Sequence, residues 1–400
     1  MQLSPIQTSL APQLANSAAQ PASPLNLPVR RLRIAVVTEY YYPHLGGICE
    51  HVHYFAREAR LAGHHVDIIT SNIPGAAPTP DVIRIGQSKT VYANGSMARI
   101  SVGLGMRRRM REVLRAGRYD IVHVHSPLTP VLPLLAVEEA NAPVVGTFHT
   151  YFERAIAYRV GAPYFRSRLR RLDAAIAVSP SAVEALEKYF EADWRIVPNG
   201  IDVNEFAPDQ PRPPYMRTDV PVILYFGRLD PRNGLRHLID AFRLVRASGR
   251  EAQLLVAGGG PLSNYYRKLA DGDPDITFTG NVLGSRAAYY ANSTIYAAPT
   301  TRGASFGITL LEAMACETPI VCSRMAGFRD VVKHEREALM VPPRDHRAMA
   351  EALTRLLDDE TLRARMGKAG RQQALRYDWR NVTDEVLSVY VEVLGRPRRS

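Results

Sequence analysis

The feature that most constrains the fold of this chain is a regular alternation, from residue 32 onward, of short unbroken apolar runs and amphipathic stretches. Residues 32–38 and 65–71 form two such runs, and the stretch 48–63 between them places Val52 and Phe55 on one helical face. Runs without polar alternation are typical of strands buried on both sides, and interleaved helices cover such strands in parallel sheets. The alternation therefore predicts the α/β class.

The alternation starts a second time after a proline-rich, polar stretch at residues 209–219. Further apolar runs lie on both sides of it, at residues 120–126, 143–150, 174–179, 194–199, 221–229, 252–260, 276–280 and 295–300. A length of 400 residues also favours two domains over one. We expect two doubly wound Rossmann-like domains, residues 31–208 and 220–375, that bind ligands in a cleft beyond the carboxyl ends of their strands. Residues 1–30, rich in Ser, Pro, Ala and Gln, are expected to form a disordered tail.

The composition favours an anionic partner. The formal net charge is +11, and of the 50 basic residues all but five lysines (Lys89, Lys188, Lys268, Lys333 and Lys368) are arginines, which suit phosphate and carboxylate groups. Nucleic acid, acidic lipid and phosphorylated metabolites all carry such charge. The sequence has no nucleic-acid recognition motif, so nucleic acid is excluded as the expected partner. The oligomeric state stays open.

The cysteines and apolar runs indicate a cytoplasmic chain. Cys49, Cys316 and Cys322 are odd in number and lack metal-ligand spacing, so we expect reduced thiols. The first thirty residues lack the basic start and apolar run of a signal peptide. No apolar run reaches the roughly 18 residues that a membrane span needs. Any membrane contact is therefore expected to be peripheral.

Polar residues and glycines stand at predicted strand ends in the first domain. Gly46 and Gly47 lie between the first strand and the first helix, where backbone amides can approach a phosphate, although a tight turn would need the same glycines. His149 and Thr150 end a strand and would project into the cleft, where an imidazole can hydrogen-bond a sugar hydroxyl; a core histidine is the alternative. His123 and His125 lie on one strand face, without a third ligand that the sequence identifies, so no metal site is predicted.

The second domain repeats this arrangement around a phosphate-binding pattern. Arg228 and Arg232 follow the first strand of that domain, and Gly259 stands in the loop after the next strand. A guanidinium in such a turn can bind a diphosphate bidentately. The stretch TTRGASFGITLLEA, residues 300–313, continues the pattern: a glycine loop leads into a helix whose first amides come from Ser305, Phe306, Gly307 and Ile308. Glu312 falls on the helix face where a carboxylate could hold a ribose diol. Turns and a solvated helix are the alternatives.

Eight segments together resemble one enzyme family. They are GGICEHVHYFARE, YANGSMARISVG, YDIVHVHSP, GTFHT, VPNGID, YFGRLDPRNG, SFGITLLEAMA and YDW. From about residue 32 to residue 394 the chain resembles the retaining glycosyltransferases of family 4, which have the GT-B fold, and most of all the bacterial phosphatidylinositol mannosyltransferases.

The resemblance implies roles for individual residues. The first domain would bind the acceptor, the second the nucleotide sugar, and a helix in residues 376–400 would cross back to the first domain. Catalysis would rest on His149, Arg228 and Glu312, with Arg228 on the diphosphate and Glu312 on the ribose. Val282 would lie near the base, Gly46 and Gly47 along the donor phosphates, and Asn94, Arg99 and Thr150 on the acceptor side. No metal or other cofactor is implied, because arginines and helix amides would neutralise the leaving diphosphate.

A basic helix is expected at residues 106–117. It carries Arg107, Arg108, Arg109 and Arg111, with Met106, Met110, Val113 and Leu114 interleaved. Such a helix suits the surface of an anionic membrane, and the lipid mannosyltransferases have a basic helix at the same place; a solvated surface helix is the alternative. The expected activity is transfer of a hexose, mannose by resemblance, to a lipid such as phosphatidylinositol at the inner face of the cell membrane.

Two positions depart from the family pattern. Ala304 stands where the family has a glutamate that touches the donor sugar, and Asn233 stands where it has a lysine on the diphosphate. Loss of one such contact typically lowers a rate about 100- to 1,000-fold. We expect an altered but active site, in which Arg302 could bind a donor sugar that carries a carboxylate. A soluble acceptor and a non-catalytic nucleotide-sugar binder are the rival hypotheses.

Overall fold

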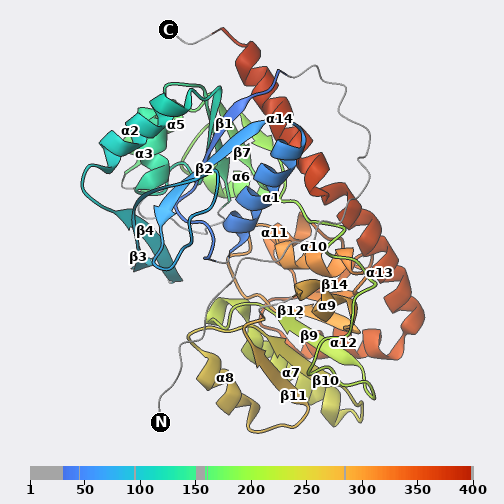
Figure 1. Ribbon diagram of the computed structural model, residues 1–400. Coiled ribbons are helices and arrows are strands. Elements are labelled where there is room, and N and C mark those ends of the chain that lie inside the picture. Colours follow the sequence, from blue (N-terminus) through green and yellow to red (C-terminus); the bar gives the residue numbers. More distant parts are fainter. Residues whose placement is uncertain are drawn as a thin grey trace.

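The computed structural model describes residues 30–397 except residues 45, 94–95, 150–157, 160 and 283–284. Two lobes make up the described chain, and each consists of a sheet flanked by helices (Figure 1). The elements of the first lobe are β1 (Arg33–Val37), α1 (Gly47–Leu61), β2 (His65–Asn72), β3 (Val82–Ala93), β4 (Ser96–Val102), α2 (Met106–Gly117), β5 (Ile121–His125), α3 (Leu132–Glu139), β6 (Val144–Phe148), α5 (Ala162–Leu169), β7 (Ala174–Ala177), α6 (Pro180–Glu187) and β8 (Trp194–Ile196).

The second lobe begins after the proline-rich stretch. Its elements are β9 (Val222–Phe226), η1 (Pro231–Asn233), α7 (Leu235–Ala247), β10 (Gln253–Ala257), α8 (Ser263–Ala270), β11 (Ile276–Gly280), α9 (Arg286–Ala291), β12 (Ile295–Ala298), α10 (Ile308–Ala315), β13 (Ile320–Ser323), α11 (Ala326–Arg329), β14 (Ala338–Val341), α12 (His346–Asp358) and α13 (Glu360–Ala374). The turn η2 (Leu375–Tyr377) and the helix α14 (Trp379–Gly395) follow.

Both sheets are doubly wound. In the described residues the strand orders are β4-β3-β2-β1-β5-β6-β7-β8 and β11-β10-β9-β12-β13-β14. The winding direction reverses between β1 and β5 in the first lobe and between β9 and β12 in the second, and ligands of such sheets bind at these points. The pairing is parallel throughout except for the antiparallel hairpin of β3 and β4. Sequence reasoning missed this hairpin, because neither strand has the unbroken apolar pattern of a doubly covered strand.

The last helix joins the two lobes. α14 leaves the second lobe and runs along α1 of the first (Figure 1). Trp379, Val386 and Tyr390 of α14 share a buried core with Ile34 and Phe55 of the first lobe. The expected return of the C-terminal helix to the first domain is therefore confirmed. No helix among the residues that the structure describes is long and apolar enough to cross a membrane.

The chain passes between the lobes twice, once near Ile201 and once near Trp379, and these two segments contact each other. The amide of Ile201 donates to the carbonyl of Tyr377 at 2.8 Å, and the amide of Trp379 donates to the carbonyl of Ile201 at 3.2 Å. Arg371 of α13 donates in addition to the carbonyls of Val203 (3.1 Å) and Phe206 (2.7 Å). The two connections between the lobes thus form one hydrogen-bonded unit.

Candidate active site

The start of α1 meets the second lobe. A Cβ atom added to Gly47 would lie 2.9 Å from Cδ1 of Ile308, the first residue of α10, whereas one on Gly46 would have open space. Ser179 also donates from Oγ to the carbonyl of Ser305 at 2.9 Å, across the same boundary. The glycine pair therefore lies where the lobes approach, with the loop 300–307 on the opposite side.

Imidazoles line the first-lobe side of this boundary. His125 and His149 share a hydrogen bond between Nδ1 and Nε2 at 2.8 Å, and Nδ1 of His51 bonds Oδ1 of Asn199 at 2.9 Å. The ring of His51 packs edge-on against that of His149 at 4.8 Å. His123 belongs to a different network, because it bonds Thr147 and Tyr390 instead.

Burial keeps these imidazoles neutral. It lowers the pKa of His51 to about 4 and the pKa of His149 well below its usual value, and the hydrogen bonds that these rings make with Asn199 oppose this only in part. The ligand atoms of His51, His125 and His149 lie within 4.8 Å of one another, so the fold supplies the further ligands that the sequence did not identify for His125. A metal held there would displace the bond between His125 and His149. We therefore describe the group as a hydrogen-bonded imidazole chain.

The turn after β9 brings cations to the second-lobe side. The buried carboxylate of Asp230 pairs with Nε of Arg232 at 3.3 Å and with Nε of Arg228 at 3.9 Å. Asn233 donates from Nδ2 to the carbonyl of Arg228 at 2.7 Å. Asn233 therefore stabilises the turn. Its side chain is directed at the backbone, whereas the lysine of the family pattern would supply a cation at this position.

Arg228 also acts across the boundary between the lobes. Burial lowers the pKa of His44, and the positive charges of Arg99 and Arg228 lower it further. Arg99 lies on β4 and donates to Oγ of Ser88 at 3.3 Å. The charge of one arginine from each lobe thus acts on the same imidazole, and two positive charges at such a place suit anionic groups. Asn94 and Thr150, the other two predicted acceptor residues, lie outside the described residues.

Packing explains several of the predicted donor-site glycines. A Cβ atom on Gly259 would clash with Oδ1 of Asn281, and one on Gly307 would lie 2.9 Å from Cδ1 of Phe328. Gly307 also has φ of 108°, which favours glycine. Phe306 is buried and packs edge-on against Tyr377 at 5.9 Å. Its side chain therefore packs beneath the loop, and only the backbone groups of Phe306 remain for a ligand.

The remaining donor-site predictions fall at the edge of this region. Val282 is half-buried and packs against the large core. Ala304 is buried, and Arg302, two residues earlier, is exposed. Where the family pattern has a carboxylate, this chain therefore has the methyl group of Ala304, and the cation of Arg302 lies at the surface nearby.

The prediction that Glu312 presents an accessible carboxylate is wrong. Only 1% of its side chain is exposed, and its Oε1 pairs with Nη1 of Arg286 at 2.9 Å. The same Nη1 pairs with Oε1 of Glu50 on α1 at 2.9 Å. The residues Glu50, Arg286 and Glu312 thus form an ion triad between the lobes. Burial raises the pKa of Glu312 to about 7, against the opposing charge of Arg286. The cavity beside it has a volume of only about 10 Å³, which is too small for a sugar ring.

Sequence reasoning missed Arg286 and Glu50. Arg286 opens a short helix and Glu50 follows the glycine pair, so each looks like a charge on a solvated helix face. Sequence reasoning likewise missed Glu39, a buried carboxylate just after β1 whose Oε2 accepts the amides of Val131 (3.3 Å) and Leu132 (3.0 Å). Burial raises the pKa of Glu39 to about 7. A charged residue directly after a buried strand was the available signal.

Comparisons with known proteins identify the family. Residues 45–205 match the profile described as Glycosyltransferase Family 4, and residues 220–359 match the one described as Glycosyl transferases group 1. The chain is 32% identical to a phosphatidyl-myo-inositol mannosyltransferase of Mycobacterium tuberculosis, over 91% of this chain and 98% of the relative. This chain is a member of glycosyltransferase family 4. The resemblance read from the motifs is thereby confirmed.

Two further likenesses agree. A phosphatidyl-myo-inositol mannosyltransferase of Propionibacterium freudenreichii is 31% identical over 90% of this chain and 94% of its own length. The crystal structure of a glycosyltransferase from Rickettsia africae ESF-5 superposes with a TM-score of 0.74 at 19% identity, over 92% of this chain and 100% of the other. The fold of the present glycosyltransferase is therefore GT-B, as expected.

The basic helix of this glycosyltransferase differs from its expected state. Met106, Met110, Val113 and Leu114 are buried in the core of the first lobe, so its apolar face is not free to enter a membrane. Arg107 pairs with Glu138 and with Glu139 (2.6 Å), Arg111 pairs with Glu139 (2.7 Å), and Arg108 and Arg109 pair with Glu112 (2.8 and 3.6 Å). The physical reason is that the apolar face of a helix can be buried on only one side. In α2 this face packs against the sheet of the first lobe, so it cannot also enter a membrane.

One apolar side chain next to α2 is nevertheless exposed to solvent. Leu104, in the loop between β4 and α2, is fully exposed, and Val102 beside it is 38% exposed. Single exposed leucines are common, but this one stands between two glycines and next to Arg107 and Arg108.

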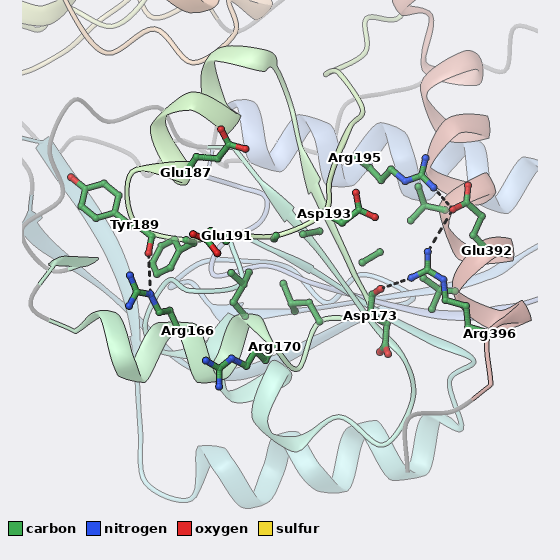
Figure 2. Close-up of a pocket in the computed structure, with 18 of the residues that line it drawn as sticks. Arg166, Arg170, Asp173, Glu187, Tyr189, Glu191, Asp193, Arg195, Glu392 and Arg396 are labelled. Atoms are coloured by element: carbon green, nitrogen blue, oxygen red, sulfur yellow. Dashed lines mark hydrogen bonds and ion pairs between the residues drawn. The ribbon is translucent and has the colours of Figure 1, made fainter.

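A cavity of about 810 Å³ lies away from these residues. It opens at the amino ends of β7 and β8, beside the end of α14, whereas the candidate site lies at the carboxyl ends of the strands (Figure 2). Leu172, Phe190 and Val393 are among the buried apolar residues that line it. Charged residues surround it, among them Arg195 and Arg396 with Glu392 between them. The candidate site remains the boundary between the lobes, because the family motifs converge there.

Proposed function

We propose that this chain is a retaining hexosyltransferase that moves mannose from a nucleotide diphosphate sugar to a phosphatidylinositol-type lipid at the cytoplasmic face of the membrane. Relatives over 90% or more of the chain are named phosphatidyl-myo-inositol mannosyltransferases, and a further one is named a GDP-mannose-dependent alpha-mannosyltransferase. The observation that carries the proposal is that the positive charges of Arg99, from the first lobe, and Arg228, from the second, both lower the pKa of His44. Two arginines there suit two anions, the donor diphosphate and the lipid phosphate.

In the proposed reaction the bond between the anomeric carbon and the diphosphate oxygen breaks, the acceptor hydroxyl oxygen forms the new bond on the same face of the sugar, and the hydroxyl proton passes to the leaving diphosphate oxygen. Arg228 and Arg232, which Asp230 holds in the turn, would neutralise the leaving diphosphate together with the amides of Gly47 and of residues 305–308. No metal would then be required. His149 would contribute as a neutral hydrogen-bonding group, because burial disfavours its charged form.

A reconstituted assay tests the activity. Purified protein is supplied with GDP-mannose or UDP-glucose and with vesicles that contain phosphatidylinositol, and products are analysed by mass spectrometry. We expect a lipid product one hexose heavier, with an unchanged anomeric configuration by NMR and undiminished yield in the presence of a chelator. Arg228→Met should abolish transfer, whereas Arg250→Met, a matched surface arginine paired with Asp358 at 2.7 Å, should not. Hexose transfer to water-soluble acceptors alone would contradict the lipid assignment.

One observation supports a second candidate donor. Ala304 removes a carboxylate from the sugar pocket, and Arg302 adds an exposed cation nearby. A donor with a carboxylate-bearing sugar would suit such a pocket. Comparing UDP-glucuronate with UDP-glucose for the intact protein and for Arg302→Ala tests this idea. If both proteins use the two donors equally, the acidic-donor hypothesis is wrong.

A further inference from the structure

Three buried imidazoles each have one ring nitrogen within 4.8 Å of the others. They belong to His51 on α1, His125 on β5 and His149, which directly follows β6. Burial lowers the pKa of all three rings, so each ring is neutral and has one nitrogen with a lone pair. Three neutral imidazoles form the ligand set of some zinc enzymes. The group therefore has the composition of a transition-metal site.

The hydrogen bonds of this group leave two ring nitrogens without a partner. Oδ1 of Asn199 can only accept, so Nδ1 of His51 carries the proton of that ring and Nε2 has the lone pair. Nε2 of His51 and Nε2 of His125 are both buried, and neither has a hydrogen-bond partner among the described residues. Buried polar groups of native proteins are usually satisfied, so two unpartnered nitrogens in one cluster indicate a ligand. This observation is independent of the spacing of the rings.

The rings need only small shifts to bind a metal. Nitrogens held at about 2.0–2.1 Å from a tetrahedral zinc ion lie about 3.3 Å from one another. Nδ1 of His125 and Nε2 of His149 lie 2.8 Å apart, so this pair would open by about 0.5 Å. The proton that the pair shares would move to the other nitrogen of the ring that carries it. Asn199 would keep His51 oriented, as the outer hydrogen-bond partners of ligating histidines do.

The boundary between the lobes gives access to the group. His51 lines the small space there together with Arg286 and Ile308 of the second lobe, so an ion can reach it when the lobes part. Nitrogen ligands suit zinc and the neighbouring metals cobalt, nickel and copper, whereas magnesium and calcium prefer oxygen ligands. The ligand atoms therefore select a transition metal.

We propose that His51, His125 and His149 form a binding site for a divalent transition metal such as Zn²⁺, and that its occupancy blocks hexose transfer. The metal site goes beyond the proposed function and does not depend on it. The block does rest on the proposed function, because a bound metal would withdraw His149 from the hydrogen bond assigned to it during transfer. The metal would be an inhibitor and not a cofactor, since arginines neutralise the diphosphate in the proposed reaction.

Metal binding is measured on the full chain, purified without a histidine tag and freed of metal by a chelator. We expect Zn²⁺ to bind with a stoichiometry of one, measured by competition with a chromophoric chelator, and Mg²⁺ not to displace it. X-ray absorption at the zinc edge should show three imidazole ligands in the intact protein, a result that requires no variant. Failure to bind Zn²⁺, or a zinc ion coordinated mainly by oxygen, would overturn the proposal.

Variants locate the site. Asn199→Ala removes an outer hydrogen bond and should weaken Zn²⁺ binding about 10- to 100-fold, and His51→Gln, which removes a ligand, should weaken it further. The matched control is His65→Gln, because His65 is exposed, pairs with Asp67 at 3.2 Å and lies outside the group. Zn²⁺ should raise the unfolding temperature of the intact protein and of His65→Gln, but not that of His51→Gln. Equal Zn²⁺ affinities of His51→Gln and the intact protein would place the metal elsewhere and overturn the assignment.

The transfer assay tests the block. Saturating Zn²⁺ should reduce turnover by the intact protein and by His65→Gln, and a chelator should restore it. The turnover that remains in His51→Gln should not respond to the same concentration of Zn²⁺. Undiminished turnover by the metal-loaded intact protein would overturn the block. If the protein binds Zn²⁺ at the three histidines but transfers no hexose with or without the metal, the proposed function and the block fail, whereas the metal site is confirmed.

Discussion

Leu104 offers the most direct test of membrane binding. The apolar face of α2 is buried, so the exposed apolar group beside its arginines is the side chain of Leu104. A fully exposed leucine that enters the acyl region is stabilised by about 1.5–3 kcal/mol. The substitution Leu104→Ser should therefore weaken partitioning onto vesicles roughly 10- to 150-fold.

The assay is flotation with vesicles that contain phosphatidylinositol, at several protein-to-lipid ratios. Leu61→Ser is the matched control, because Leu61 is 76% exposed at the end of α1 and lies outside the β4–α2 loop. Thermal unfolding should be nearly the same for all three proteins, since neither leucine is packed in a core. Equal partitioning of Leu104→Ser and the unchanged protein would refute the reasoning, and equal losses for both leucines would show that the effect is not local.

Three further outcomes follow from packing and titration. Gly234→Ala should destabilise the protein by about 1–3 kcal/mol in urea unfolding, because its new Cβ atom would overlap the carbonyl of Pro299 and the backbone has φ of 74°. Trp379→Ala should cost about 3–5 kcal/mol by the same measurement, since Trp379 is buried and stacks on Tyr54 at 5.8 Å. The raised pKa of Glu39, about 7, means that the folded state keeps a proton which the unfolded state loses from 4.5 upward, so stability should fall as the pH rises from 4.5 to about 7 and level off above it. Glu39→Gln should abolish up to roughly 3 kcal/mol of that fall, and an unchanged pH profile would contradict the assignment.

The parts of the fold that follow local patterns could be predicted. The runs at 32–38, 65–71 and 252–260 appear as β1, β2 and β10, because a strand covered on both faces needs apolar residues at every position. The arginine at 228 was predicted from its place after a strand, and its charge acts on His44 of the first lobe. The residue pattern of a single strand or helix is enough to predict such elements and the residues that directly follow them.

Pairings between distant residues could not be predicted. Arg286 meets Glu50 over more than two hundred positions, and nothing in either local sequence selects the partner. The same limit applies to α2, whose residues alone do not say whether its stripe of Met106 and Leu114 covers protein or lipid. Glu312 shows the consequence: its helix was predicted, but its burial depends on another lobe.

The paired crossings at Ile201 and Trp379 restrict how the two halves of the enzyme can move. Two chain segments that lie side by side and share hydrogen bonds act as one short pivot, so the halves can swing apart about it but cannot slide or rotate freely. Relative motion at the boundary between the lobes is then expected to be largest at the end farthest from this pivot. A substrate that enters at that end would meet the full displacement of one lobe relative to the other, whereas the residues next to Trp379 would move very little.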